Sequence, residues 1–177
     1  MSWRVGILTI SDKGSRGERV DTSGAAVREM LASLEATVEH YQVVPDEKAV
    51  VASRLREWAD EAGLDLIITT GGTGLSPRDV TPEATLAAVE RLVPGMAEAM
   101  RQAGLSATPM AMLSRAVVGV RGHTLIVNLP GSERGVRQNL GQLLPVLAHA
   151  LEILRGEAGD HVATAEGVER AGGENDS

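Results

Sequence analysis

The apolar and polar positions of this chain repeat with two periods, which predicts strands and helices in alternation. Residues 3–10 form a short β-rich run, and residues 21–36 carry apolar side chains at helical spacing behind a polar, cap-like start. Residues 64–70 are apolar almost throughout, as expected for a strand covered on both faces. The other predicted elements are strands at 36–44 and in a hairpin within 115–129, and helices at 47–62, 82–92, 95–104 and 132–156.

This order of elements predicts the fold class. Successive strand–helix–strand units favour right-handed crossovers and a parallel sheet with helices on both faces. We therefore predict an α/β fold: a three-layer sandwich with a mostly parallel central sheet and a β-hairpin near its edge. The hairpin should turn at residues 121–123, and Pro145 should kink or divide the last helix.

Composition sets the number of domains. With 177 residues, 43% of them apolar, the chain has enough material for one domain with a substantial core. We assign that domain to residues 1–155. Residues 156–177 contain six acids and one arginine with few large apolar side chains, so we interpret them as an acidic mobile tail.

Composition also excludes several classes of function. The absence of cysteine rules out disulfides, thiolate metal sites and cysteine nucleophiles. The chain has no Phe, two Trp and one Tyr, too few aromatic rings to stack exposed bases, so no nucleic-acid partner is expected. It shows neither the pattern of a signal peptide nor an apolar run of membrane-spanning length. We expect a cytoplasmic protein without a membrane partner.

Four polar loops follow the predicted parallel strands. Since ligands of open α/β sheets bind at the carboxyl ends of the strands, these loops are expected to share one edge. They are rich in glycine, hydroxyl and charged residues, which favours a pocket for an anionic small molecule, although plain connections can have the same composition. The loops are residues 11–18, 45–48, 71–79 and 130–135.

The glycine-rich loop at 71–74 fits no standard phosphate motif. Gly74 is followed by Leu75 where a Walker A loop needs lysine, and Pro77 occupies the position where a dinucleotide fingerprint needs its third glycine. Gly71, Gly72 and Gly74 could still present backbone N–H groups to a phosphate or let a flat ring approach. For GGTG alone, a simple turn that closes a strand against a helix is the favoured alternative.

Two acidic residues on these loops suggest a metal. Asp79 lies close to the start of a helix, but Thr81 before Pro82 is the better predicted cap, which leaves Asp79 available. Asp46 also precedes a helix, and capping is a serious alternative for it. Two carboxylates without a His or Cys cluster suit Mg²⁺, which combines a few protein oxygens with substrate phosphates.

Six motifs of this chain together resemble the molybdopterin-binding family of molybdenum cofactor biosynthesis, in its compact MogA/MoaB type. The resemblance runs in order over residues 4–155, and the glycine loop with PRDVTPEAT is its most specific part. The motifs are ISD at 10–12, PDE at 45–47, TTGGTG at 69–74, PRDVTPEAT at 77–85, LSRA at 113–116 and NLPGS at 128–132.

The resemblance implies an adenylyltransferase that moves AMP from Mg-ATP to the terminal phosphate of molybdopterin and releases pyrophosphate. It implies catalytic and Mg²⁺-binding roles for Asp46 and Asp79. It also implies a site for nucleotide and molybdopterin, in which Ser114, Arg115, Gly131 and Ser132 are expected on the molybdopterin side and Ser11 and Asp12 close the rim. The implied binding residues are Ser11, Asp12, Gly71, Gly72, Thr73, Gly74, Ser76, Arg78, Ser114, Arg115, Gly131 and Ser132.

Other functions are compatible with the same motifs. A carrier could bind molybdopterin without turning it over, as is suspected for some members of the MoaB branch. A scaffold module is a second alternative, which the small size of the chain disfavours. The resemblance also implies a homo-oligomer, either trimer or hexamer, and a molybdenum insertase as a partner. The segment after Gly131 departs from the Pro- or Lys-containing versions common in the family, which leaves roles beyond Ser132 unassigned.

Overall fold

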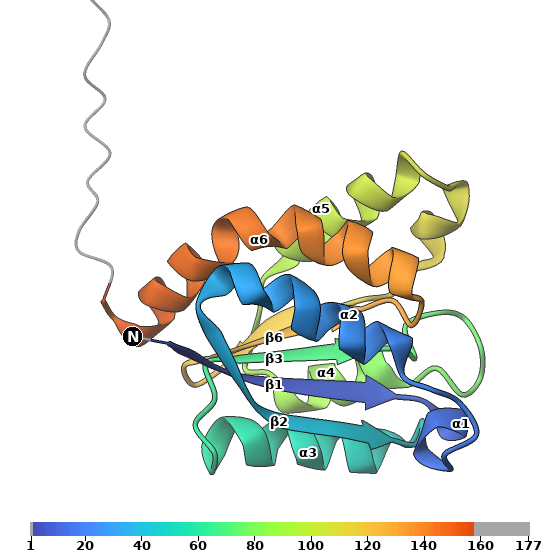
Figure 1. The fold of residues 1–177 in the computed structure, drawn as a ribbon, viewed down its shortest axis with the longest axis horizontal. Coiled ribbons are helices and arrows are strands. Elements are labelled where there is room, and N and C mark those ends of the chain that lie inside the picture. The colour runs from blue at the N-terminus through green and yellow to red at the C-terminus, as the bar shows by residue number, and fades with distance from the viewer. Residues whose placement is uncertain (1, 158–177) are drawn as a thin grey trace, which may run out of the picture.

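The computed structural model describes residues 2–157 and shows the expected three layers (Figure 1). Most of the tail proposed for residues 156–177 lies outside the described residues. The strands are β1 (Trp3–Ile10), β2 (Ala36–Val44), β3 (Leu66–Thr70), β4 (Arg91–Leu92), β5 (Val118–Arg121) and β6 (Thr124–Leu129). The α-helices are α1 (Asp12–Ser15), α2 (Thr22–Met30), α3 (Lys48–Asp60), α4 (Thr81–Ala88), α5 (Pro94–Leu105) and α6 (Glu133–Arg155). Two 3₁₀ helices are η1 (Leu31–Leu34) and η2 (Pro109–Leu113).

The central sheet is mostly parallel, as the sequence predicts. Its strand order is β2-β1-β3-β6-β5-β4, and the first four of these strands run parallel. β5 pairs antiparallel with β6, and β4 pairs antiparallel with β5. The predicted hairpin is therefore confirmed, and Gly122 turns it with a φ of +55°.

Helices cover both faces of this sheet (Figure 1). Because side chains alternate along a strand, Val5 and Ile7 of β1 pack with α2, α5 and α6, whereas Leu8 and Ile10 pack with α3 and α4. Each face thus has its own apolar cluster, which explains why the central strands are apolar almost throughout. Within residues 2–157, no helix has the length and apolar content needed to cross a membrane.

A buried amide links the sheet to α4 near the carboxyl edge. Asn128 is fully buried, and its Nδ2 donates to the hydroxyls of Thr69, at 3.0 Å, and Thr85, at 2.9 Å. Its Oδ1 accepts from the backbone N–H of Val117 at 3.1 Å. Three polar contacts from one side chain therefore fix β6, β3, α4 and the start of the hairpin relative to one another.

Some local predictions were wrong. Of the two outcomes predicted for Pro145, division of the last helix does not occur, since α6 is continuous from Glu133 to Arg155. The helix predicted for 82–92 ends at Ala88, because Glu90 N and Val93 N donate to carbonyls of β5 and make residues 91–92 an edge strand. The short helices α1 and η2 were not predicted.

The strand order places a switch point between β1 and β3. The chain leaves β1 to form β2 on one side and then returns to form β3 on the other. The loops after these strands consequently diverge, and such a divergence is where open α/β sheets bind their ligands.

Candidate active site

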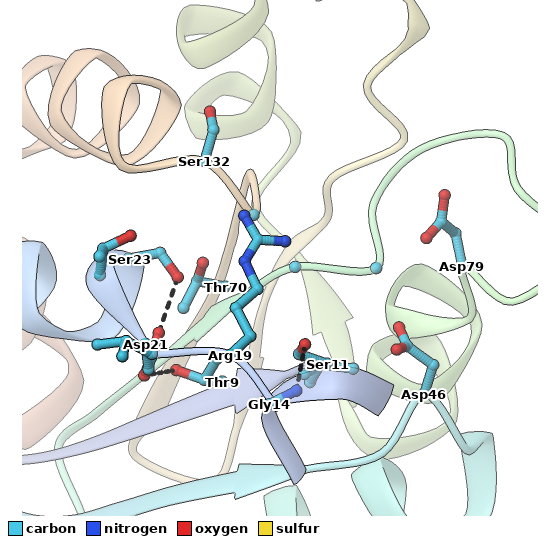
Figure 2. A pocket seen from close by; sticks show the side chains of 16 residues that line it. Thr9, Ser11, Gly14, Arg19, Asp21, Ser23, Asp46, Thr70, Asp79 and Ser132 are labelled. Atoms are coloured by element: carbon cyan, nitrogen blue, oxygen red, sulfur yellow. Dashed lines mark hydrogen bonds between the residues drawn. The ribbon is translucent and has the colours of Figure 1, made fainter. Parts of the chain in front are cut away.

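A cavity of about 320 Å³ opens at this switch point (Figure 2). All four loops that the sequence predicted to share one edge contribute to it. Its lining includes seven of the predicted site residues: Ser11, Asp46, Gly71, Gly72, Asp79, Gly131 and Ser132. The lining also includes residues that were not predicted: Thr9, Ile10, Gly14, Arg19, Val20, Asp21, Thr22, Ser23 and Thr70.

The glycine loop forms the floor of the cavity through its backbone. Gly71 and Gly72 have φ values of +96° and +66°, a region that favours glycine. A Cβ on Gly71 would lie 2.3 Å from the carbonyl oxygen of Ile10, and one on Gly131 would lie 3.2 Å from the Cα of Gly71. Three loops therefore meet here so closely that a side chain on Gly71 has no space and one on Gly131 would require its neighbour to shift.

Thr81 holds this floor in place and does not cap α4, so the capping prediction for it was wrong. It is the first residue of α4, and its hydroxyl donates to the carbonyl of Gly71 at 2.8 Å. Its backbone N–H donates to the carbonyl of Gly72 at 3.1 Å. The tertiary acceptor competes successfully with the local capping geometry, and α4 is thereby attached to the glycine loop.

Asp12 and Asp46 are joined reciprocally. The backbone N–H of Asp12 donates to Asp46 Oδ2 at 2.9 Å, and the backbone N–H of Asp46 donates to Asp12 Oδ1 at 3.0 Å. Arg78 contacts both oxygens of Asp12, at 2.8 and 3.0 Å, and these hydrogen bonds lower the pKa of that carboxyl. Asp12 and Arg78 thus neutralise each other beside the cavity.

Asp46 and Asp79 remain directed at the cavity from two loops (Figure 2). Asp46 does not cap α3, whose N-cap residue is Glu47. Burial raises the pKa of the Asp46 carboxyl, and the negative charges of Asp12 and Asp79 raise it further, against the hydrogen bond from Asp12 N. Asp79 accepts only the backbone N–H of Ser76, at 3.0 Å, among the described residues. This pair of carboxylates is the part of the site that could hold a cation.

Arg115 contacts the glycine loop and does not line the cavity. Its Nε donates to the carbonyl of Gly74 and its Nη2 to the carbonyl of Asp79, both at 2.8 Å, while Nη1 contacts Glu83. Its backbone N–H also donates to the carbonyl of Thr73 at 2.9 Å. The lining likewise excludes Asp12, Thr73, Gly74, Ser76, Arg78 and Ser114.

A model described as "Probable molybdopterin binding domain" matches residues 6–149, most of the chain. The chain belongs to the molybdopterin-binding family. The resemblance drawn from the six motifs is thus confirmed, and both Asp46 and Asp79 lie within the matched domain.

Several named members of the molybdopterin-binding family align with most of this chain. The molybdopterin adenylyltransferase of Helicobacter pylori strain J99 is 38% identical over 154 residues, which span 86% of this chain and 88% of that protein. The protein of the same name from Escherichia coli K12 is 42% identical over 77% of this chain and 71% of its own length. A solved structure titled molybdopterin biosynthesis enzyme MoaB, from Thermus thermophilus, is 60% identical with a TM-score of 0.83 and covers 87% of this chain and 97% of its own.

Sequence reasoning missed the side of the cavity formed by Thr9 and the start of α2. Asp21 was recognised only as part of a helix start, and it does cap α2 by accepting from the backbone N–H of Gly24 at 2.9 Å. The available signal was the position of Asp21 in the sequence. Residues 19–21 end the loop that follows β1 and residues 22–23 begin α2, so this part of the chain must return past the same edge of the sheet. These residues therefore line the cavity of this protein.

Proposed function

We propose that this protein is a molybdopterin adenylyltransferase, which transfers AMP from Mg-ATP to the terminal phosphate of molybdopterin and releases pyrophosphate. The observation that carries the proposal is the placement of Asp46 and Asp79 over a backbone floor at the switch point of the sheet. The names of the two bacterial relatives support the same activity. They favour an enzyme over a molybdopterin carrier.

The reaction requires positioning more than covalent chemistry from the protein. An oxygen of the molybdopterin phosphate attacks the α-phosphorus of ATP, and the bond between that phosphorus and the bridging oxygen to the β-phosphate breaks. Pyrophosphate keeps the electron pair of that bond and leaves opposite the attacking oxygen. The N–H group of Gly72 and the hydroxyls of Ser11 and Ser132 would orient the phosphates within the cavity, whereas the N–H of Gly71 donates to the carbonyl of Leu129.

The carboxylates of Asp46 and Asp79 fit a Mg²⁺ ion that takes its remaining ligands from substrate oxygens and water. No group of three or more His, Asp or Glu side chains in residues 2–157 could hold a metal ion alone. Mg²⁺ commonly uses one or two carboxylates together with phosphates and water, which corresponds to Asp46 and Asp79. When bound with the nucleotide, the ion would neutralise charge on the triphosphate. The charge of the ion would also relieve the mutual repulsion of these two carboxylates.

The predicted roles of the remaining site residues divide into two groups. We propose that Ser11, Gly131 and Ser132 contact substrates, because they line the cavity. Arg115, predicted to bind the molybdopterin phosphate, is proposed instead to hold the loop that carries Asp79, because its guanidinium contacts Gly74, Asp79 and Glu83. Thr73, Gly74 and Ser76 belong to that same loop.

We propose a cytoplasmic homo-oligomer, trimer or hexamer, that delivers its product to a molybdenum insertase. An exposed apolar surface around η2 supports self-association, since side chains of 45–64% exposure gather there. These residues are Leu105, Met110, Met112 and Leu113. Light scattering of the purified protein would distinguish trimer, hexamer and monomer.

Pyrophosphate release with each component omitted in turn tests the activity. We expect release only when protein, Mg-ATP and molybdopterin are all present, with an adenylylated product identified by mass spectrometry. Asp79→Asn should keep the fold and molybdopterin binding and lose adenylyl transfer. The matched control is Asp60→Asn, which removes a carboxylate paired with Arg121 outside the cavity. Tight molybdopterin binding without pyrophosphate release would favour the carrier.

A further inference from the structure

Arg19 differs from the other arginines near the cavity. It is the only basic residue among the described lining residues, and it lies in the loop between α1 and α2. Its guanidinium makes no hydrogen bond or ion pair with any residue in 2–157, whereas Arg78 is engaged by Asp12 and Arg115 by the glycine loop. Figure 2 shows the Arg19 side chain reaching into the cavity. One guanidinium without a hydrogen-bonded partner among the described residues is therefore available to a ligand.

The nearest carboxylate on this side of the cavity does not need Arg19. Asp21 accepts hydrogen bonds from the hydroxyl of Thr9 at 2.6 Å, from the hydroxyl of Ser23 at 3.0 Å, from the backbone of Gly24 and from the hydroxyl of Tyr41. Burial raises the pKa of Asp21, but these four donors outweigh it and lower the pKa overall. The charge of Asp21 is thus stabilised within the protein, and Arg19 stays free.

The cavity consequently has two ends of different character. Asp46 and Asp79 occupy one end, where they repel phosphate unless a cation lies between them and it (Figure 2). Arg19 reaches the other end, near Ser132, where its guanidinium and the Ser132 hydroxyl can donate to a phosphate directly. A guanidinium presents parallel N–H donors that match two phosphate oxygens.

We propose that Arg19 binds the terminal phosphate of molybdopterin. The assignment rests on the proposed function: the attacking and leaving oxygens lie on opposite sides of the α-phosphorus. The attacking phosphate therefore belongs at the end away from Asp46 and Asp79, which would hold Mg²⁺ beside the leaving pyrophosphate. Arg19 makes and breaks no covalent bond; it holds the attacking group in place by charge and hydrogen bonds.

Direct binding measurements with Arg19→Gln test the proposal. Molybdopterin affinity is measured by its pterin fluorescence without nucleotide, and nucleotide affinity by calorimetry with Mg²⁺ and an ATP analogue whose α,β-bridge is methylene. We expect the molybdopterin Kd to rise about tenfold, the scale of one charge-assisted hydrogen-bonded contact, and the analogue Kd to change by less than about twofold. Arg19→Lys, which keeps the charge without the fork, should lie between.

Arg16→Gln is the matched control. Arg16 lies in the same loop and carries the same charge, but it pairs with Glu18 at 2.9 Å and does not line the cavity. Its replacement should leave both Kd values unchanged within about twofold, which separates a local contact from a loss of net charge.

Two results would overturn the assignment. A molybdopterin Kd unchanged in Arg19→Gln would show that the residue does not contact this substrate, and a larger loss for the ATP analogue would move Arg19 to the nucleotide. Both measurements report binding, so they remain interpretable if the wild-type protein binds molybdopterin but releases no pyrophosphate. That outcome would contradict the proposed function, and the molybdopterin Kd of Arg19→Gln would still show whether Arg19 contacts this substrate.

Discussion

Replacing Gly71 by alanine tests whether the cavity floor depends on direct contact between backbones. The new Cβ would lie 2.3 Å from the carbonyl oxygen of Ile10, and neither atom belongs to a flexible side chain. Relief therefore requires β1 and β3 to separate at the point where their loops diverge. Gly71→Ala should accordingly destabilise the fold and open the cavity.

The magnitude follows from two contributions. Placing a Cβ at a positive φ costs about 1–2 kcal/mol, and forcing a methyl group into a packed contact adds about 1–3 kcal/mol. We expect Gly71→Ala to lower the free energy of unfolding by about 3–4 kcal/mol. Gly122 also has a positive φ, +55°, but a Cβ there meets no atom within 4 Å among the described residues, so Gly122→Ala should cost only about 1 kcal/mol.

Urea unfolding of both variants at one temperature provides the comparison. Each replacement reduces the freedom of the unfolded chain to the same extent, so that effect cancels in the difference. The remaining difference of about 2–3 kcal/mol corresponds to a Tm lower by about 4–12 °C in a chain of this size. If the two variants agree within about 0.5 kcal/mol, the floor tolerates a side chain and our account of the glycine loop is wrong.

Three further replacements have defined outcomes. Because the pKa of Asp46 is raised, its ionised form weakens the fold at neutral pH, so Asp46→Asn should raise the urea midpoint while abolishing Mg²⁺-dependent turnover. Asn128→Leu removes the three hydrogen bonds of the buried amide and should lower the free energy of unfolding by about 3 kcal/mol in urea titrations. Burial raises the pKa of Asp65, but hydrogen bonds from Arg155 and from the backbone of Arg4 outweigh it and lower the pKa overall. Asp65 therefore stabilises the fold above about pH 4 and loses this effect as the pH falls. The urea midpoints of wild type and Asp65→Asn should converge as the pH falls from about 5 to below about 3.

The fold was predictable because its information is local and periodic. The alternation of Val5 and Ile7 with Leu8 and Ile10 is visible in the sequence, and it places α-helices on both faces of the sheet. The order of strands and helices then brings the four loops to one edge. Residue pattern alone could therefore locate the cavity and identify Asp46 and Asp79 as carboxylates on it.

The roles of individual side chains were less predictable because distant partners decide them. Thr81 has the local sequence of a helix cap, yet the carbonyl of Gly71, ten residues away, accepts its hydroxyl. Arg115 meets Gly74 across 41 residues of sequence, and no local pattern records that contact. Arg16 and Arg19 lie in the same charged loop, and the sequence does not distinguish them. Only the structure shows that Glu18 forms its ion pair with Arg16 and not with Arg19.

A cavity floor made of main chain also restricts how the protein can diverge over evolution. Mutation changes side chains, and a new side chain at Gly71 would collide with the carbonyl of Ile10, while one at Gly131 would crowd the Cα of Gly71. Single amino-acid replacements can therefore hardly alter the backbone groups that form the cavity floor. The loop that carries Arg19 and Val20 is exposed and tolerates change, so new preferences among phosphorylated substrates would arise there first.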